Sequence, residues 1–388
     1  MDTDEDDAGA GLAVTSQGMY AGTQDEPPPD APLEQRLAWP LRVQADACEV
    51  MGSHLYAHLL RAAAQDLLAG GPTREVLTPH AGRGRADALA LRLMAAVHRL
   101  VLSGEAPALA AHYPSVGGDG DPEAAWPSFR DLLAREPGLV SDLVGRPLQT
   151  NEVGRCAALL WGLLQIAETR GLPLRLLEVG TSAGLLLRFD HYRYGGAGAA
   201  WGPADSEVDL DGFWAQAPPT GTDVEVEVAG RAGCDPAPVD PTSDEGLLSL
   251  RSAVWADQTP RLARLDGAVT IARRVPAEIT AASVEDWLPP RLAEPAEGVA
   301  TIVLHSVVEE SLHAEQRRVV HEAVRAAGAR ATPSAPLAWL RLEPISRLRH
   351  HGVSLTAWPG TGPRDADGDT EVLAVCGGHG ADVRRPDG

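Results

Sequence analysis

Apolar residues recur at spacings of three and four over the first part of the chain, from about residue 33 to residue 167. This period is typical of amphipathic helices. It is clearest in four segments, 59–68, 86–102, 129–134 and 153–167. Gly and Pro residues interrupt the pattern between the segments. The sequence therefore predicts an α-helical N-terminal domain over residues 32–170.

From residue 171 onwards, short apolar runs alternate with helical stretches. Strands are predicted at 174–179, 223–229 continuing toward 234, 277–282, 299–305, 337–342, 353–358 and 371–376, and helices at 247–272 and 313–327. Apolar strands that alternate with helices predict a mainly parallel sheet covered on both faces. We expect an α/β, Rossmann-like domain of about seven strands over residues 171–385. An insertion rich in Gly, Pro and Trp interrupts it at 192–221.

Composition narrows the class of protein. Residues 1–31 are acidic and rich in Gly and Pro, which predicts a disordered tail. The net charge of −21 opposes nucleic-acid binding. The chain contains neither a secretory signal pattern nor an apolar run of membrane-spanning length, so we expect a cytoplasmic protein that binds no membrane. Its four cysteines are scattered singly, which predicts neither disulfides nor a metal site.

Two residue types are nearly absent. The chain has no lysine, which excludes pyridoxal-phosphate chemistry, lysine Schiff bases and a P-loop lysine. Asn151 is the only asparagine. A GC-rich genome accounts for both absences. The alternative for Asn151 is a position where Asp would not serve, because only an amide offers both a donor and an acceptor.

The segment 176–185, Leu-Leu-Glu-Val-Gly-Thr-Ser-Ala-Gly-Leu, carries the most specific signal of the chain. It is typical of a strand, a tight turn and a helix. Gly180 and Gly184 allow a ligand to approach the backbone, and the helix N-terminus offers free N–H groups. The order E-x-G-x-x-x-G is similar to the first motif of class I S-adenosylmethionine-dependent methyltransferases. A plain strand-to-helix turn is the alternative.

Ligands of open α/β sheets lie outside the carboxyl ends of the strands, so the residues that end each strand are site candidates. Asp235 follows the second predicted strand, where an acid can accept hydrogen bonds from ribose hydroxyls; the alternative is a turn-initiating Asp. Ser283 follows the third strand. His305 ends the fourth and is a candidate general base, or else a histidine bonded at the edge of the core.

Further polar residues are candidates for a substrate pocket. The first group, at the start of the helix before the first strand, is Asn151, Glu152 and Arg155. Trp255, Asp257, Gln258 and Arg261 combine an aromatic wall with polar groups. Tyr192 and Arg193 begin the insertion and are candidates for a lid. The alternatives are a surface ion pair between Glu152 and Arg155, and a helix cap at Asp257.

Several motifs resemble those of a bacterial family known as domain of unknown function 2332, over roughly residues 35–385. They are Gln-Thr-Asn-Glu-Val-Gly-Arg at 149–155, the 177–185 turn, Asp-x-Tyr-Arg-Tyr at 190–194, Gly-Cys-Asp at 233–235, Val-Trp-x-Asp-Gln-x-x-Arg at 254–261 and Thr-Pro-x-Ala-Pro-Leu-Ala-Trp-Leu at 332–340. The resemblance implies a Rossmann-like core and no known reaction.

The more distant resemblance to methyltransferases implies a methyltransferase-type sheet and S-adenosylmethionine as cofactor. It implies cofactor contacts at Glu178, Gly180, Ser182, Gly184, Asp235 and Ser283. The chain departs from that pattern at Ser182, where the family has glycine, and at Ser283, where an acid holds the adenine amine. We expect methyl transfer to a small molecule, with His305 as the catalytic base. The alternative is a ligand-binding or scaffold protein that has lost the cofactor.

Overall fold

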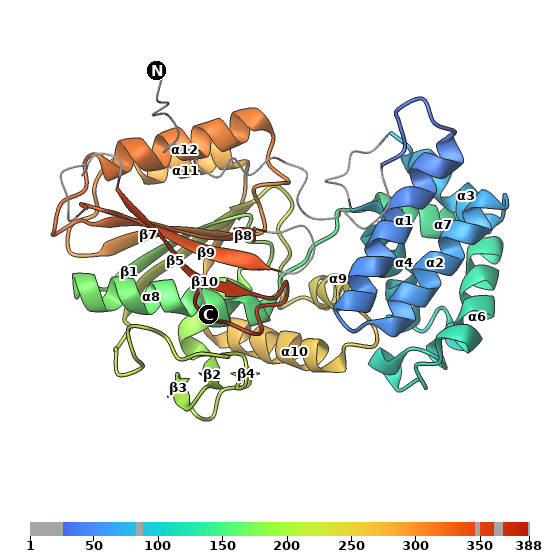
Figure 1. Ribbon diagram of the computed structural model, residues 1–388, viewed down its shortest axis with the longest axis horizontal. Coiled ribbons are helices and arrows are strands. Elements are labelled where there is room, and N and C mark those ends of the chain that lie inside the picture. Colours follow the sequence, from blue (N-terminus) through green and yellow to red (C-terminus); the bar gives the residue numbers. More distant parts are fainter. Residues whose placement is uncertain (1–25, 83–87, 346–349, 361–367, 387–388) are drawn as a thin grey trace, which may run out of the picture.

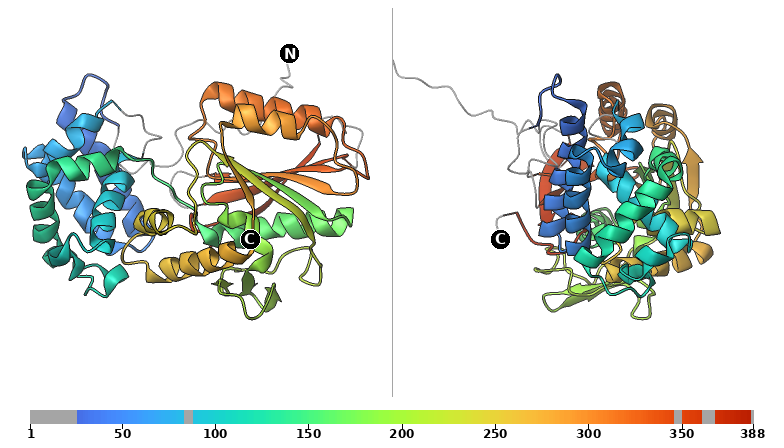
Figure 2. Two further views of the ribbon diagram at one scale, coloured as in Figure 1. Left: turned by 180° about the vertical axis from the view of Figure 1, so that it is seen from behind. Right: turned by 90° about the vertical axis from the view of Figure 1, so that its right-hand side faces the viewer.

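The computed structural model describes residues 26–82, 88–345, 350–360 and 368–386. The chain forms a helical part and a part built on a β-sheet, which lie side by side (Figure 1). The view from behind shows the same arrangement, with the sheet between two layers of helices (Figure 2). Residues 1–25 of the predicted acidic tail lie outside the described residues.

The helical part comprises seven α-helices among the described residues, joined by short turns. They are α1 (Leu33–Val50), α2 (His54–Leu68), α3 (Pro72–Leu77), α4 (Leu89–Leu102), α5 (Pro107–Ala110), α6 (Pro122–Arg135) and α7 (Pro137–Gly145), with the 3₁₀ turns η1 (Thr78–His80) and η3 (Pro114–Val116). Their apolar faces form one core, to which residues between Leu37 and Val144 contribute. Trp255 and Ala256, from the other part of the chain, also belong to this core. Those two residues anchor the helical part to the sheet part.

The large sheet has seven strands in the order β10-β9-β8-β7-β1-β5-β6. The strands are β1 (Leu174–Val179), β5 (Val228–Asp235), β6 (Glu278–Ala281), β7 (Ala300–Ser306), β8 (Leu337–Pro344), β9 (His351–Trp358) and β10 (Asp369–Cys376). The pairs among β6, β5, β1, β7 and β8 are all parallel, whereas β9 runs antiparallel to both β8 and β10. The mainly parallel, seven-stranded sheet expected from the sequence is confirmed.

Helices cover both faces of this sheet. One face carries α11 (Val284–Arg291) and α12 (Ala314–Gly328), and the other carries α8 (Cys156–Arg170) and α10 (Thr259–Arg274) (Figure 1). Helix α8 packs on β8, β9 and β10 and shares the sheet's core. The predicted domain boundary at residue 170 therefore differs from the packing, since α8 belongs with the sheet. Helices that are apolar on nearly every side are buried, and α8 is such a helix.

The predicted helix at 247–272 is two helices, α9 (Asp244–Ala253) and α10. The break at residues 254–258 is imposed by tertiary contacts, because Trp255 there is buried in the core of the helical part. The second strand also lies later than expected, at 228–235. Part of the predicted insertion forms a small separate sheet in the order β3-β2-β4, from β2 (Arg193–Gly196), β3 (Ala199–Trp201) and β4 (Asp209–Leu210).

Candidate functional site

The strand order places a topological switch point between β1 and β7. From β1 the chain continues to β5 and β6 on one side, and β7 and β8 follow on the other side. This is the 3-2-1-4-5 order of doubly wound sheets, in which ligands bind outside the carboxyl ends of the strands at the switch point. The residues that follow β1, β5, β6 and β7 are therefore the candidates for a site.

The turn after β1 is held in left-handed backbone conformations. Gly180, Ser182 and Gly184 have φ angles of 67°, 52° and 69°. Glycine adopts this region without steric cost, whereas a residue with a Cβ is strained there by roughly 1–2 kcal/mol. The predicted sharp turn is confirmed, and the helix after it is the short 3₁₀ segment η5 (Leu185–His191).

Both glycines of this turn are in close contact with the protein itself. An ideal Cβ on Gly180 would lie 2.6 Å from Cγ2 of Val308, and one on Gly184 would lie 2.6 Å from Cδ1 of Ile279. Val308 comes from the loop after β7, on the other side of the switch point. At these two positions the missing side chains allow neighbouring elements to pack closely.

Glu178 lies beneath the turn. The residue is 1% exposed, and its Oε2 accepts a hydrogen bond from the hydroxyl of Thr181. Burial raises the pKa of the Glu178 carboxyl to about 8. A carboxyl group in that position is mostly protonated at neutral pH and supports the turn from inside.

Asp235, at the end of β5, joins the turn to its own strand. Its Oδ2 accepts from the N–H of Ser182 at 3.1 Å, and its Oδ1 accepts from the N–H of Ala237 at 2.9 Å. The side-chain amide of Gln149 donates to the same Oδ1 at 3.2 Å and to the carbonyl of Ala237 at 2.6 Å. The carboxylate thus fixes the backbone of two loops at the carboxyl edge of the sheet.

Asn151 reaches the same turn from the linker between the two parts. Its Oδ1 accepts from the N–H of Leu185 at 2.9 Å, which satisfies the first free donor of η5. The cap of its own segment, η4 (Val153–Arg155), is instead Glu152, which accepts from the N–H of Gly154 at 3.2 Å. Asn151 therefore contacts the first motif and caps a helix that begins 34 residues later in the chain.

Two serines complete this edge. Ser182 is 3% exposed, and its Oγ is buried without a hydrogen-bond partner among the described residues. Ser283, the residue before α11, is half-buried and donates from Oγ to Oδ2 of Asp286 at 2.9 Å. Buried polar groups are nearly always bonded, so an unpartnered hydroxyl in this turn is a feature that a ligand or a water would complete.

His305 is the last residue but one of β7 and does not reach the surface. The residue is 2% exposed, and its Nδ1 lies 2.7 Å from Oε1 of Glu343 on β8. The same Oε1 accepts from the N–H of Val308 at 3.0 Å, next to Val307, whose φ is 58°. Since a β-branched residue is strained in that region, this histidine–carboxylate pair holds a strained loop at the switch point.

The candidate substrate residues of the linker and of α10 form a buried ionic network. Nε of Arg261 donates to Oε2 of Glu152 at 2.7 Å, and Nε of Arg155 donates to the carbonyl of Gly378 at 3.1 Å. Burial opposes ionisation of Glu152, but the two guanidinium groups outweigh it and hold the pKa of its carboxyl at about 2. The alternative of a surface ion pair between Glu152 and Arg155 does not describe them, because Glu152 lies in a buried network.

Trp255, Asp257 and Gln258 connect this network to the helical part. Oδ1 of Asp257 accepts from Oγ of Ser53 at 2.6 Å, and its Oδ2 accepts from the N–H of Leu55 at 3.1 Å. Asp257 therefore caps helix α2, more than 200 residues earlier in the chain. Gln258 donates to the carbonyl of Met51 at 2.8 Å. Their contacts join the two parts.

A known protein family matches this chain over most of its length. The family model described as "Uncharacterized protein conserved in bacteria (DUF2332)" matches residues 39–385. The chain belongs to this bacterial family. No curated protein and no solved structure matches it. The DUF2332 family resemblance of the sequence is confirmed, and the family description carries no reaction.

Within this DUF2332 chain, Tyr192 and Arg193 do not form a lid over the turn. Tyr192 is fully buried, and its hydroxyl donates to the carbonyl of Leu185 at 2.6 Å. The backbone N–H of Arg193 donates to the carbonyl of Val208 at 2.9 Å, within the small sheet. The Tyr192 side chain, which suggested a lid, is instead packed against η5 and supports it.

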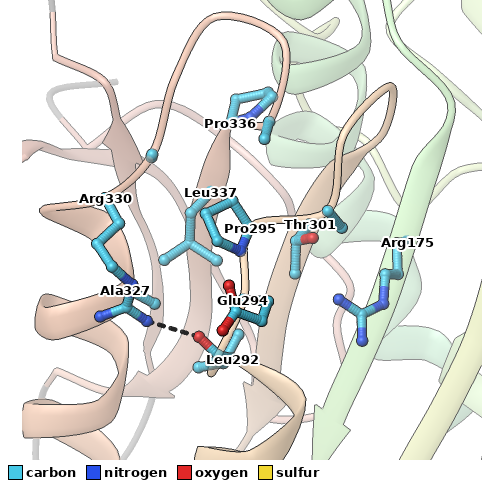
Figure 3. A pocket seen from close by; sticks show the side chains of 12 residues that line it. Arg175, Leu292, Glu294, Pro295, Thr301, Ala327, Arg330, Pro336 and Leu337 are labelled. Carbon is cyan, nitrogen blue, oxygen red and sulfur yellow. Dashed lines mark hydrogen bonds between the residues drawn. The ribbon is translucent and has the colours of Figure 1, made fainter.

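Gly180 and Gly184 line neither of the two best-formed cavities among the described residues. The first is a depression open to solvent near the amino ends of β1, β7 and β8. Figure 3 shows its arginines on opposite walls, with Nη2 of Arg330 bonded to the carbonyl of Leu292 at 2.7 Å. This cavity lies at the end of the sheet opposite the switch point. The second lies between the helical part and α9.

Sequence reasoning missed Gln149, Glu343 and His379 as site residues. Arg341 and Glu343 alternate with apolar residues near the end of β8. Polar residues at the end of a mostly apolar strand indicate a polar site beside the carboxyl end of that strand. Burial lowers the pKa of the His379 imidazole to about 3, and its ring lies edge-on to Trp255. No local pattern indicates His379, because its neighbours come from distant segments.

Within the described residues, no group of three or more His, Cys, Asp or Glu side chains is placed to hold a metal ion. No described helix is long and apolar enough to cross a membrane.

Proposed function

We propose that this chain transfers a methyl group from S-adenosylmethionine to a small-molecule acceptor. One observation carries the proposal. The Gly180 turn ends β1 and Asp235 ends the neighbouring β5, so both lie at the carboxyl edge beside the switch point. In doubly wound folds this edge binds the nucleotide. The first motif, which resembles that of methyltransferases, thus accompanies the topology that such a motif requires.

The unpartnered Oγ of Ser182 supports the fit of this cofactor. It can donate to the methionine carboxylate, and Gly180 beside it is half-buried, so part of the turn is accessible. A ribose hydroxyl can replace Gln149 at Oδ1 of Asp235, because the Gln149 amide keeps its shorter bond to the carbonyl of Ala237. Ser283, between β6 and α11, is the residue that would meet the adenine. When bound, S-adenosylmethionine supplies an electrophilic methyl group on sulfur.

The protein's own contribution in this proposal is positioning. Holding two reactants in line contributes several kcal/mol to a transfer reaction. The pair formed by His305 and Glu343 orders the loop at Val308 through Oε1 of Glu343. Because His305 is buried, we assign it the role of a positioning residue. Its predicted role as a base would require the acceptor to reach a side chain that is only 3% exposed.

A second candidate function is ligand binding or scaffolding without catalysis, and a specific observation favours it. The N–H of Ser182 is bonded to Asp235, and the N–H of Leu185 is bonded to Asn151. These are the donors that a cofactor would use at a helix N-terminus. A turn whose donors are satisfied by the protein is stable without a ligand.

Calorimetric titration with S-adenosylmethionine and S-adenosylhomocysteine decides between the two functions. The methyl-transfer proposal expects saturable binding of both, and it expects Asp235→Asn to weaken binding about 10- to 100-fold, equivalent to about 1–3 kcal/mol. Asp240→Asn is the matched control. Asp240 also accepts from a backbone N–H in the segment after β5, that of Thr242 at 2.9 Å, but it is exposed.

Absence of binding by either compound at millimolar concentration would contradict methyl transfer and leave the binding or scaffold function. Unchanged affinity in Asp235→Asn, together with a lower melting temperature, would show that Asp235 only shapes its turn.

A further inference from the structure

The second cavity lies at the junction of the two parts of the molecule. It is a depression open to solvent between α4, the end of α7, the linker and α9. Its polar lining consists of Arg92, Arg99, Arg146, Gln149, Ser249 and Ser252. We propose that this arginine cavity binds a compact oxyanion of the phosphate type.

The charges around the cavity indicate an anion. The chain as a whole carries −21, yet three guanidinium groups line this one depression. Arg99 and Arg146 both turn to the same carboxylate, Glu245 of α9: Nη2 of Arg99 bonds its Oε2, and Nη1 of Arg146 lies 3.4 Å from its Oε1. Two cations that converge on one carboxylate form the donor arrangement that an oxyanion ligand uses.

The Glu245 carboxylate is held only weakly between Arg99 and Arg146. Its side chain is 66% exposed, and the side chain of Arg146 is 57% exposed. Exposed ion pairs of this kind contribute about 0–1 kcal/mol, because water and salt screen them. An external anion can therefore displace Glu245 at little cost. The side chain of Arg99 is only 16% exposed, so its charge remains at the cavity.

The donor set favours a phosphate-type ion over a carboxylate. Each guanidinium has five N–H donors, and the hydroxyl of Ser249 can donate one more bond, whereas the single O–H donor of Ser252 is already in use. Oγ of Ser252 donates to the carbonyl of Ser249 at 2.7 Å, which brings the two serines together on one turn of α9. A tetrahedral oxyanion has more acceptor oxygens for such a set than the two of a carboxylate.

Such an anion would join the two parts of the molecule. Arg99 belongs to α4 of the helical part, whereas Ser249 and Ser252 belong to α9 of the sheet part. Gln149, which also lines the cavity, is bonded to Asp235 at the candidate site. Binding to the folded state stabilises a protein by RT ln(1 + [L]/Kd), so phosphate is expected to raise the melting temperature.

The test is a titration of the full chain with inorganic phosphate, at an ionic strength held constant with chloride. Calorimetry and thermal unfolding are both followed. We expect saturable binding and a rise in melting temperature that chloride alone does not give. Arg99→Gln and Arg146→Gln should each weaken phosphate binding at least about tenfold, the loss of one charge-assisted contact. Arg146 is exposed, so its variant tests the site without a threat to folding.

Two further variants fix the interpretation. Glu245→Gln should tighten phosphate binding, because it removes the competing carboxylate. Arg135→Gln, which breaks an exposed pair with Asp131 on α6, should leave phosphate binding unchanged. Equal responses to phosphate and chloride would overturn the proposal, as would unaltered affinity in Arg99→Gln and Arg146→Gln or weaker binding in Glu245→Gln. These outcomes do not depend on S-adenosylmethionine binding, so the two proposals can fail separately.

Discussion

At the scale of single residues, the most unusual group is the Glu178 carboxyl. Its pKa is raised to about 8 by burial, and the hydroxyl of Thr181 donates a hydrogen bond to it. In the unfolded chain the same group titrates near 4.5. The folded state therefore binds a proton more tightly than the unfolded state between these two pH values. Its contribution to stability is complete below about pH 4.5 and declines as the pH rises toward 8.

We expect Glu178→Gln to remove the loss of stability that the Glu178 carboxyl causes as the pH rises from about 4.5 to about 8. The amide is uncharged at every pH, and its oxygen can still accept from Thr181. Relative to the wild type, the variant should gain stability as the pH increases from 5 to 8, by up to about 1.4 kcal/mol per pH unit. Urea unfolding at several pH values measures this slope. An identical pH dependence in both proteins would show that Glu178 is ionised in the folded state.

The sequence predicted Glu178 as a residue that contacts cofactor, because it ends an apolar strand before a Gly-rich turn. The prediction of the strand and of the turn came from residue types and spacing, and both are present. The side chain's surroundings depend on α8 and η5, which cover it from other parts of the chain. Local sequence does not contain that information.

At the scale of elements, the decisive contact is between the linker and η5. A 3₁₀ segment has free N–H groups at its start, and Leu185 N–H is satisfied by Asn151 of a distant segment. The bond needs only an acceptor. The rarity of asparagine in the chain suggested that Asn151 needs both a donor and an acceptor, and the cap accounts for the acceptor alone.

We expect Asn151→Ala to destabilise the protein by about 0.5–2 kcal/mol, since it removes the cap of η5. Asn151→Asp should be close to neutral in stability, because a carboxylate accepts the same bond and favours a helix N-terminus. Thermal unfolding of both variants measures the difference. If Asn151→Asp instead loses ligand affinity at unchanged stability, the amide donor is in use, and the substrate-binding role predicted for Asn151 stands.

Element positions were largely predictable, whereas the joints between elements were not. The strand from residue 174 to residue 179 was predicted with the bounds that the structure has. The helix from 247 to 272 was not, because the apolar period continues through residues 254–258. The helix is interrupted there, and Trp255 packs into the core of the helical part instead. The spacing of apolar residues predicts that a residue is buried, but it does not predict in which core.

At the scale of the whole molecule, two cores are joined by a small set of polar contacts. Asp257 accepts from Ser53 and from the N–H of Leu55, and Trp255 packs into the helical core from the same segment. Asp257 is half-buried, but Ser53 and Leu55 are buried, so loss of the carboxylate leaves two buried donors unsatisfied. The stability of the helical part is therefore expected to depend on a residue of the sheet part.

We expect Asp257→Ala to destabilise the protein by about 1–3 kcal/mol and to make the helical part more sensitive to limited proteolysis. The matched control is Asp266→Ala, which removes a half-exposed carboxylate of α10 that lies 3.7 Å from Arg251. Urea unfolding and protease cleavage near α2 are the measurements. Equal behaviour of the two variants would show that the cap on α2 does not hold the parts together.

The sequence by itself determined the class of each segment. Residue period and strand-ending polar residues specified the helical part, the mainly parallel sheet and the turn at Gly180, because these depend on neighbours along the chain. Only the tertiary structure decided the partners. In the folded chain Asp235 accepts from the N–H of Ser182, Asn151 caps η5, and Arg99 and Arg146 both contact Glu245. Those contacts depend on which distant segments meet, and a side chain's chemistry is fixed by the groups that surround it in the folded protein.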